Sequence, residues 1–518
     1  MRGLQRVRGV WLAVMCAGAV CAAHAAQPDT GPLGIDAARH LLLRASFAAA
    51  PDEIQQFSRL TRGDAADRLL AQTSQPRVTP PPVWVNEPVV PASRLRTMSA
   101  DERRDYQRNT VARGVEMRGW WLHEMAATPA PLAEKMALFW HNHFVSSQQK
   151  VRQPQYLYRQ NLLLREHALG NFGVFLHAMA RDPAMVIYLD SASNRKGQPN
   201  ENFAREVMEL FTLGEGHYSE RDVKEAARAF TGWSIDGETG AFLFRAPAHD
   251  DGEKTVLGRS GALDGDAVID ILLAQPQTAE FIVRKLWREF VSPEPDAGEV
   301  RRIAGVLRDS RYDIRTALRA LLTSDAFYAP QHRAALVKSP VDLVVGTLRQ
   351  FQMTAGDVPP FALVVAQLGQ NLFSPPNVKG WPGGEAWINS TTLLARKQFL
   401  EQLFRSGDPS DRGEPRPAMA MQPQPLAQAQ GAAASPLVAS ASPLVASAAP
   451  LVQMRQRLQR AMSDMSFDSQ RWLREAGGDA AQVPRLMLAM APQHALPPGA
   501  SGMEAIRRLT QDPVYQLK

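Results

Sequence analysis

Polar side chains between Asp190 and Glu209 have the types and the spacing to bind a ligand or to move a proton. Asp190 ends an apolar segment, and a helix is predicted to begin near Asn200 or Asn202. Free N–H groups at that helix start, with the two asparagine amides, would form a pocket facing Asp190. Glu206 and Glu209 share a helix face, where their carboxylates could ligate a hard cation or act in acid–base chemistry.

The same segment also has a structural interpretation. Glu201, Arg205 and Glu209 are spaced four residues apart, so on a helix they form a carboxylate–guanidinium–carboxylate ladder. Asn202 and Glu206 lie on an adjacent polar line with Glu209. Such a pattern is typical of a salt-bridged, solvated helix surface. In the functional interpretation, Arg205 instead orients an anionic group of a substrate.

Two histidines flank an asparagine in the Trp-His-Asn-His-Phe stretch at 140–144. On a strand, His141 and His143 would share a face and chelate one metal, whereas on a helix they point about 200° apart. Trp140 and His143 continue the apolar stripe of a helix predicted from Pro131, which favours a structural histidine. The catalytic candidates are His141, His143, Asp190, Arg205 and Glu206. In the metal alternative, the candidate ligands of a divalent cation are His143, Glu206 and Glu209.

A Pro/Gly-rich loop at 371–384 carries Lys379 and Trp381, and Trp387 follows it. Two aromatic side chains with Asn and Lys on a rigid loop suit recognition of a ligand or partner. A loop that plugs its aromatic rings into the core is the equal alternative. The predicted ligand-binding residues are therefore Asn200, Asn202, Lys379 and Trp381. A weaker polar loop contains His249, Asp250, Lys254 and Gly258.

Helical patterns dominate the elements that must position these groups. Ser99 and Glu102 form a capping box that predicts a long helix ending at about Ala127. The segment 241–245 is strand-like, and we expect it to form half of a small hairpin with 255–257. The fold is therefore predicted to be all-α, with one large multi-helix domain and at most a small β-hairpin.

The chain has 518 residues, of which 45% are hydrophobic and 21% charged, so wholesale disorder and a small disulfide scaffold are excluded. Its first residues read as a secretory signal peptide, 1–25. Basic residues precede an apolar run from Val10 to Ala23, and an Ala-His-Ala cleavage pattern follows. We therefore expect a periplasmic or secreted protein.

Cleavage after Ala25 would change the net charge and the cysteine content of the chain. It removes three arginines and both cysteines, which leaves a formal net charge of +3 and no thiol. Thiolate chemistry is then excluded from the mature chain. No basic stripe with interleaved aromatic residues indicates nucleic-acid binding. No apolar stretch beyond the signal is long enough to span a membrane.

A low-complexity segment interrupts the second half of the chain. From Pro417 to Val452 there is no charged and no aromatic residue, and a Pro-Leu-Val unit recurs. Such a composition cannot bury enough apolar surface to order the chain. We expect a helical domain at 35–405, a disordered Ala/Pro-rich linker at 406–452, and C-terminal helices at 453–518 that pack back on the main domain.

Several motifs taken together resemble the bacterial domain-of-unknown-function 1800 family. The matching segments, in order, are 140–144, 188–190, 200–206, 229–233 and 377–384, and the last four residues also look like the family's terminus. The resemblance covers roughly 37–404. It implies an exported protein whose partner is a co-exported, uncharacterised protein similar to sulfatases and phosphatases. The family supplies no settled catalytic residues.

Two classes of function follow from these patterns. We expect a non-catalytic partner or scaffold for an exported enzyme or a cell-envelope polymer. The alternative is a periplasmic or secreted hydrolase or metal-dependent enzyme with a pocket of His, Asp, Glu and Asn side chains. The chain contains no G-x-S-x-G, H-E-x-x-H or nucleotide-binding motif. A solvent-reachable cleft lined by a histidine with Asp190 and Glu206 would favour the enzyme.

Overall fold

The computed structural model describes residues 31–354, 356–406, 449–478, 481–497, 499–500 and 502–518. The predicted signal peptide, 1–25, and most of the predicted linker, 406–452, lie outside these residues. Helix α19 continues to Ser406 and helix α20 begins at Ala449, so both edges of the predicted linker are helical.

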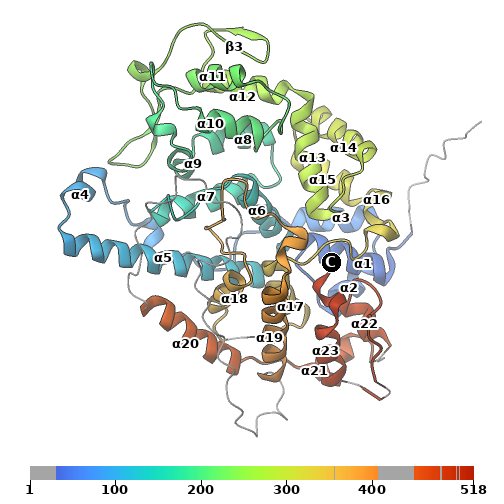
Figure 1. Ribbon diagram of the computed structural model, residues 1–518. Helices are drawn as coiled ribbons and strands as arrows, with labels where there is room; N and C mark the ends of the chain where they lie inside the picture. The colour runs from blue at the N-terminus through green and yellow to red at the C-terminus, as the bar shows by residue number, and fades with distance from the viewer. Residues whose placement is uncertain (1–30, 355, 407–448, 479–480, 498, 501) are drawn as a thin grey trace, which may run out of the picture.

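The described part of the chain is predominantly helical, as the sequence predicts (Figure 1). Its first half contains α1 (Gly34–Ala45), α2 (Pro51–Ser58), α3 (Arg62–Gln72), η1 (Val83–Asn86), α4 (Ala92–Thr97), α5 (Ala100–Ala127), α6 (Pro131–His143), α7 (Pro154–Glu166), α8 (Phe172–Ala180), α9 (Pro183–Tyr188), η2 (Ser191–Ser193), α10 (Glu201–Glu209) and α11 (Glu220–Ala229). Four short strands follow: β1 (Trp233–Ile235), β2 (Phe242–Phe244), β3 (Lys254–Val256) and β4 (Arg259–Gly261), with η3 (Ala246–Ala248) between β2 and β3.

The second half is helical again. It contains α12 (Gly265–Ala274), α13 (Pro276–Phe290), α14 (Ala297–Asp309), α15 (Ile314–Leu322), α16 (Asp325–Tyr328), η4 (Pro330–His332), α17 (Pro340–Gln350), η5 (Pro359–Phe361), α18 (Ala362–Gln367), η6 (Gly384–Trp387) and α19 (Ser390–Ser406). The last described elements are α20 (Ala449–Ser463), α21 (Ser469–Glu475), α22 (Gln482–Met487), α23 (Gly502–Gln511) and η9 (Pro513–Gln516).

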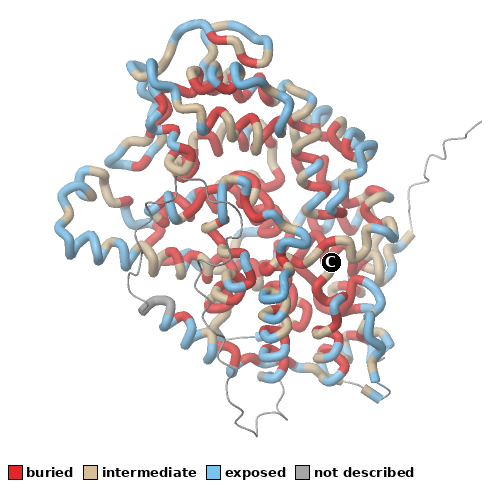
Figure 2. The backbone as a smooth tube through the Cα atoms, in the orientation of Figure 1, coloured by how far each residue is buried: buried red, intermediate tan, exposed pale blue. Residues whose placement is uncertain are grey.

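The long helix α5 begins where its capping box predicts. The Ser99 hydroxyl accepts from the backbone N–H of Glu102, and the Glu102 carboxylate accepts from the N–H of Ser99. Its first half is largely exposed, and its second half, from Met117 to Met125, is largely buried (Figure 2). The cap therefore sets the start of the helix, while tertiary packing stabilises its far end.

The predicted hairpin between 241–245 and 255–257 is wrong. Strand β2 pairs with β1, and β3 pairs with β4, both antiparallel. Each strand thus finds its partner across a short turn rather than across the loop between them. In the second hairpin, Leu257 and Gly258 both have positive φ, the conformation of a tight two-residue turn.

Helix α6 lies at the centre of the molecule. Twelve of its thirteen residues are buried, and it packs against α1, α3, α5 and α7. The helices α8 to α12 and the hairpins lie above it in Figure 1, whereas α17 and α19 to α23 lie below. The last helices pack on early ones: α20 contacts α5, α21 contacts α2, and α22 contacts α1. Residues from both ends of the described chain therefore share one core.

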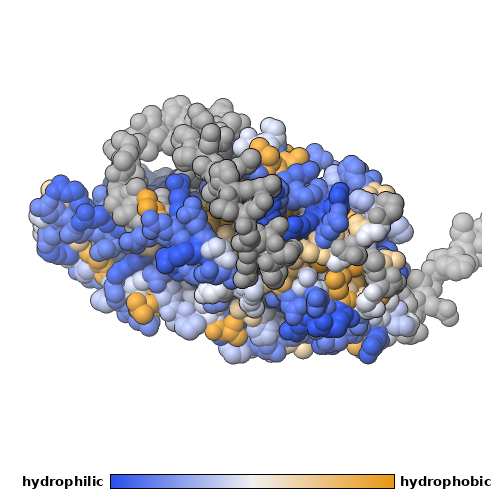
Figure 3. Space-filling view, turned by 90° about the horizontal axis from the view of Figure 1, so that it is seen from below, coloured by the Kyte–Doolittle hydropathy of each residue, from blue (hydrophilic) through white to orange (hydrophobic). Residues whose placement is uncertain are grey.

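Hydrophilic side chains predominate on the underside, where hydrophobic ones form small separate patches (Figure 3). Among the described residues, no helix combines the length and apolar character that a membrane span requires.

Candidate functional site

His141 is buried in the core. Its ring is 1% exposed and lies against the rings of Trp121, Phe373 and Trp381. Its Nε2 accepts a hydrogen bond of 3.1 Å from the backbone N–H of Phe373. Burial lowers the pKa of His141 to about 3, so the ring is neutral. Its role in the structure is to hold the chain at Phe373.

His143 is also buried, on a different side of α6. Its Nδ1 accepts a hydrogen bond of 2.9 Å from the Nζ of Lys285, which also donates to the Leu210 carbonyl at 3.1 Å. Burial and the Lys285 charge lower the pKa of His143 well below its ordinary value. Lys285 of α13 therefore links His143 of α6 to the Leu210 carbonyl at the end of α10. The two histidines point apart, as helical spacing predicts.

The predicted metal ligands do not come together. Within the described ranges, no group of three or more His, Cys, Asp or Glu side chains is placed to hold a metal ion. His143 faces Lys285, whereas the charges acting on Glu206 are those of Glu209, Lys379 and Arg205. In the described part of the chain, His143, Glu206 and Glu209 therefore do not form a three-ligand metal site.

The two asparagines of the predicted pocket fix the start of α10. Asn200 is its N-cap, and the Asn200 Oδ1 accepts from the backbone N–H of Asn202 at 2.9 Å. The Asn200 Nδ2 donates to the Ser193 hydroxyl at 3.0 Å, and the Asn202 Nδ2 donates to the Leu189 carbonyl at 3.4 Å. These bonds join the preceding loop to the helix.

Asp190 and Arg205 each have a partner on another element. Asp190 adopts a left-handed backbone conformation with φ 58°, and its carboxylate pairs with Lys150 Nζ at 2.6 Å. Arg205 pairs with Glu201, as the ladder predicts, and with Glu220 of α11. It does not pair with Glu209, because the two Glu220 oxygens accept at 2.7 and 2.8 Å instead. The second half of the predicted ladder is therefore wrong.

Glu206, Glu209, Glu215, Tyr218 and Lys379 form a group that we call the acidic face. Glu209 accepts a hydrogen bond of 2.8 Å from the Tyr218 hydroxyl and lies 3.5 Å from the Lys379 Nζ, which is 3.3 Å from Glu215. Glu206 is half-buried, and its carboxylate has no hydrogen bond or ion pair with a described residue. Burial and the neighbouring Glu209 raise the pKa of Glu206 to about 7. This carboxyl can therefore exchange a proton near neutral pH.

Asn142, between the two histidines, anchors the loop that carries Lys379. Its Oδ1 accepts from the backbone N–H of Trp381 at 2.7 Å, and its Nδ2 donates to the Trp381 carbonyl at 3.3 Å. Gly380 has φ 82°, and a Cβ there would lie 2.2 Å from the Asn142 Oδ1. Only glycine permits both this conformation and this approach.

The aromatic residues of the loop face inwards. Trp381 is 5% exposed, and Trp387 is also buried. The loop thus plugs its aromatic rings into the core, and Trp381 offers little surface to a ligand. Lys379, 62% exposed, is the predicted ligand-binding residue of the loop that faces solvent.

A second feature is a cavity of about 730 Å³ at the N-terminal end of α10. It is lined by Ala192, Ser193, Asn194, Arg195, Gln198, Pro199, Asn200, Glu201, Gly232, Trp233, Ser234, Arg245 and Ala248. Of the predicted site residues, only Asn200 is among them. Arg195 and Arg245 are not among the site residues that the sequence predicts. They lie on two different loops, and neither loop carries a motif that indicates that the two side chains meet at one cavity.

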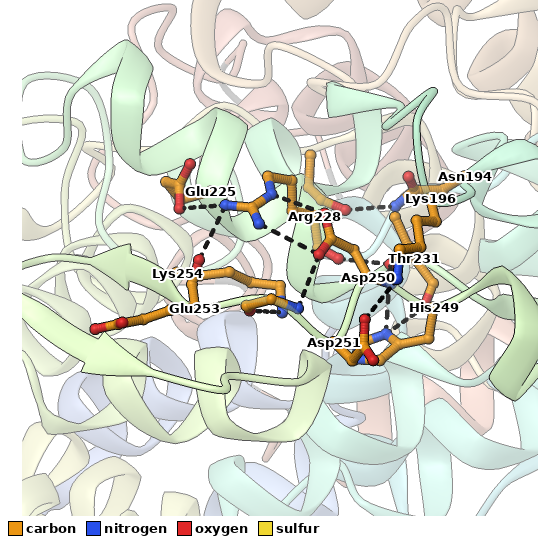
Figure 4. Close-up of polar contacts among 12 residues, drawn as sticks. Asn194, Lys196, Glu225, Arg228, Thr231, His249, Asp250, Asp251, Glu253 and Lys254 are labelled. Carbon is orange, nitrogen blue, oxygen red and sulfur yellow. Dashed lines mark hydrogen bonds and ion pairs between the residues drawn. The ribbon is translucent and has the colours of Figure 1, made fainter.

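The wall of this cavity is held by a polar clamp, shown in Figure 4. Arg228 of α11 donates from Nε and Nη2 to the two carboxylate oxygens of Asp250, at 2.8 and 3.2 Å. This pairing lowers the pKa of Asp250 to about 2. The Asp250 N–H donates to the Thr231 hydroxyl at 2.7 Å, and His249 Nδ1 lies 2.9 Å from the Thr231 carbonyl. The predicted weaker polar loop therefore positions Ala248, which lines the cavity.

The fold and these contacts define a large helical protein whose motif residues mainly fasten loops to helices. Residues 40–517 match the family described as protein of unknown function (DUF1800). The match spans nearly the whole chain, so the chain belongs to this family. No curated protein and no solved structure matches it.

Proposed function

We propose that this protein is exported and acts as a non-catalytic binding component, a partner or scaffold for an exported enzyme of the cell envelope. The observation that carries this proposal is the burial of both motif histidines. Each ring is neutral and hydrogen-bonded within the fold, so neither His141 nor His143 reaches a substrate. The motif side chains shape and brace a surface, as a binding protein requires.

The acidic face is the contact surface of this proposal. Lys379 and Glu215 are its most exposed charges, and Asn142 holds the Lys379 loop in place. A charged surface on an anchored loop loses little conformational entropy when a partner binds. Its mixed charges select a partner of complementary pattern.

The proposed function is tested by asking whether this chain binds the exported sulfatase- or phosphatase-like protein that the family resemblance implies as its partner. We would measure association of the mature chain with that protein by sedimentation velocity and calorimetry, after mass spectrometry of the processed N-terminus. We expect a stable complex that Lys379→Glu weakens about tenfold or more. The matched control is Arg301→Glu, an exposed residue of α14, which should leave the affinity unchanged. The absence of a complex, or equal weakening by both variants, would contradict the proposal.

The enzyme alternative is favoured by one observation, the pKa of about 7 at the half-buried, unpaired Glu206. Such a carboxyl is suited to general acid–base catalysis near neutral pH. The same purified chain should therefore be assayed alone on sulfate and phosphate esters. We expect no turnover. Turnover that Glu206→Gln abolishes, while the circular dichroism spectrum stays unchanged, would replace the binding role with an enzymatic one.

A further inference from the structure

The cavity at the start of α10 is distinct from the acidic face and has free charge of the opposite sign. Arg245 is exposed, and its guanidinium has no hydrogen bond or ion pair with any residue that the structure describes. Arg195 donates from Nε and Nη2 to the Gln198 Oε1, which leaves its other guanidinium nitrogen available. Two guanidinium groups therefore line one cavity without a carboxylate partner.

Most of the acceptors around this cavity are already used by the protein. The Asn194 Oδ1 accepts from the backbone N–H of Asn200, and the Gln198 Oε1 accepts from Arg195. The Glu201 Oε2 accepts from Arg205 at 3.0 Å, whereas the Glu201 Oε1 has no bond with a described residue. The Asp236 carboxylate accepts from two backbone N–H groups of its own turn. These bonds, and to a smaller extent the Arg245 charge, lower the pKa of Asp236. The free groups are thus mainly donors, which suits an anionic ligand rich in oxygen acceptors.

The rest of the lining suits a small ring-shaped ligand. Ala192, Pro199 and Ala248 contribute small apolar groups to the lining. Trp233 also lines the cavity but is 4% exposed, so the apolar surface offered to a ligand is small. The Ser234 hydroxyl has no hydrogen bond with a described residue and can pair with a ligand hydroxyl. The volume of about 730 Å³ lies in the range of small-molecule sites, about 300–1,000 Å³. Shallow apolar patches beside hydroxyl-binding and cationic groups match the faces of a sugar ring.

We propose that this cavity binds an acidic saccharide, with Arg195 and Arg245 contacting its anionic group. Arg228 and Asp250 act as positioning residues, because they hold the loop that carries the cavity wall and do not line the cavity. The site is independent of the partner surface proposed above, since the acidic face shares none of its lining residues.

Calorimetry on the mature chain at low ionic strength tests this site. The probes are a galacturonic acid trimer, which carries carboxylates, and glucose 6-sulfate, with maltotriose as the neutral control. We expect at least one acidic sugar to bind and maltotriose not to bind. Arg245→Gln should raise the Kd about tenfold or more, and the Arg195→Gln, Arg245→Gln double variant further. Arg259→Gln, an exposed arginine of β4 outside the cavity, should leave the Kd unchanged.

Comparison of the probes also decides which anionic group the cavity prefers. Tighter binding of the trimer identifies a carboxylate site, and tighter binding of glucose 6-sulfate a sulfate site. The proposal is overturned if neither sugar binds at millimolar concentration, or if the double variant binds as well as the wild type. Binding of sodium sulfate or of a glutamate hexapeptide as tight as that of the sugars would likewise exclude a saccharide site.

Discussion

Asp342 lies in a buried charge cluster that joins the last residue of the sequence to α6 and α17. It is 1% exposed, and its carboxylate accepts from the Nζ of Lys135 and from the Nζ of Lys518, the latter at 2.7 Å. Glu289 is 3.2 Å from the Lys135 Nζ and 3.5 Å from the Lys518 Nζ. Two ammonium groups and two carboxylates thus form the ion pairs of this cluster, and the buried cations Arg44, Lys338 and Arg396 also act on Asp342. Although burial alone would raise the pKa of Asp342, the two lysines hold it well below its ordinary range.

Replacing Asp342 with asparagine leaves two buried ammonium groups against one partly exposed carboxylate. Breaking a buried ion pair from one side costs about 3–5 kcal/mol, so we expect Asp342→Asn to lower the free energy of unfolding by this amount. Lys518→Met should cost less, about 1–3 kcal/mol, because Lys135 still neutralises Asp342. The double variant, Asp342→Asn with Lys518→Met, leaves Lys135 paired with Glu289. Its cost should fall about 1–3 kcal/mol short of the sum of the single costs.

Urea unfolding followed by tryptophan fluorescence and circular dichroism measures these four free energies at pH 7. Coincidence of the two probes shows whether a single free energy describes the transition. The reasoning is refuted if Asp342→Asn changes the stability by less than about 0.5 kcal/mol. It is also refuted if the two single effects add fully in the double variant, because the charges would then act independently.

Two further variants test a buried carboxyl and the loop anchor. Burial raises the pKa of Asp182 to about 7, although the Met185 N–H and Gln160 oppose the shift. Between about pH 4 and pH 7 the folded state holds a proton that the unfolded state releases, so stability falls as pH rises through this window, by up to about 4 kcal/mol. Asp182→Asn keeps an acceptor for the cap and should flatten this part of the Tm–pH curve; an unchanged slope would contradict the assignment. Gly380→Ala should destabilise the fold by about 1–3 kcal/mol through its positive φ and its clash with Asn142, as measured by urea unfolding, and a neutral result would mean that the loop is not clamped.

Several local features were predictable because their causes lie within a few residues. The capping boxes at Ser99 and Ser219 both form, since a side chain three residues ahead reaches back to the N-cap. Pro131 begins α6, where its missing N–H costs nothing. The opposite orientations of His141 and His143 follow from helix geometry alone.

The pairings of groups distant in sequence could not be predicted in this way. The i, i+4 spacing predicts one carboxylate pair of Arg205 correctly, but its second partner is Glu220 on another helix. Lys379 approaches Glu209 because Asn142 anchors the loop more than 230 residues away along the chain. Local spacing carries no information about such contacts, because they depend on how helices dock.

The sequence by itself determined the helical class, the start of several helices and the family, because these depend on local hydrogen bonding, apolar periodicity and motifs in order. Only the tertiary structure decided what the polar motif residues do. Burial against Trp121 and Phe373 keeps the His141 ring neutral, and the ring accepts a hydrogen bond that holds the chain at Phe373. Partial burial beside Glu209 instead leaves Glu206 able to titrate near neutral pH. The physical reason is that the properties of an ionisable side chain depend on its solvation and its neighbours, and distant parts of the chain supply both.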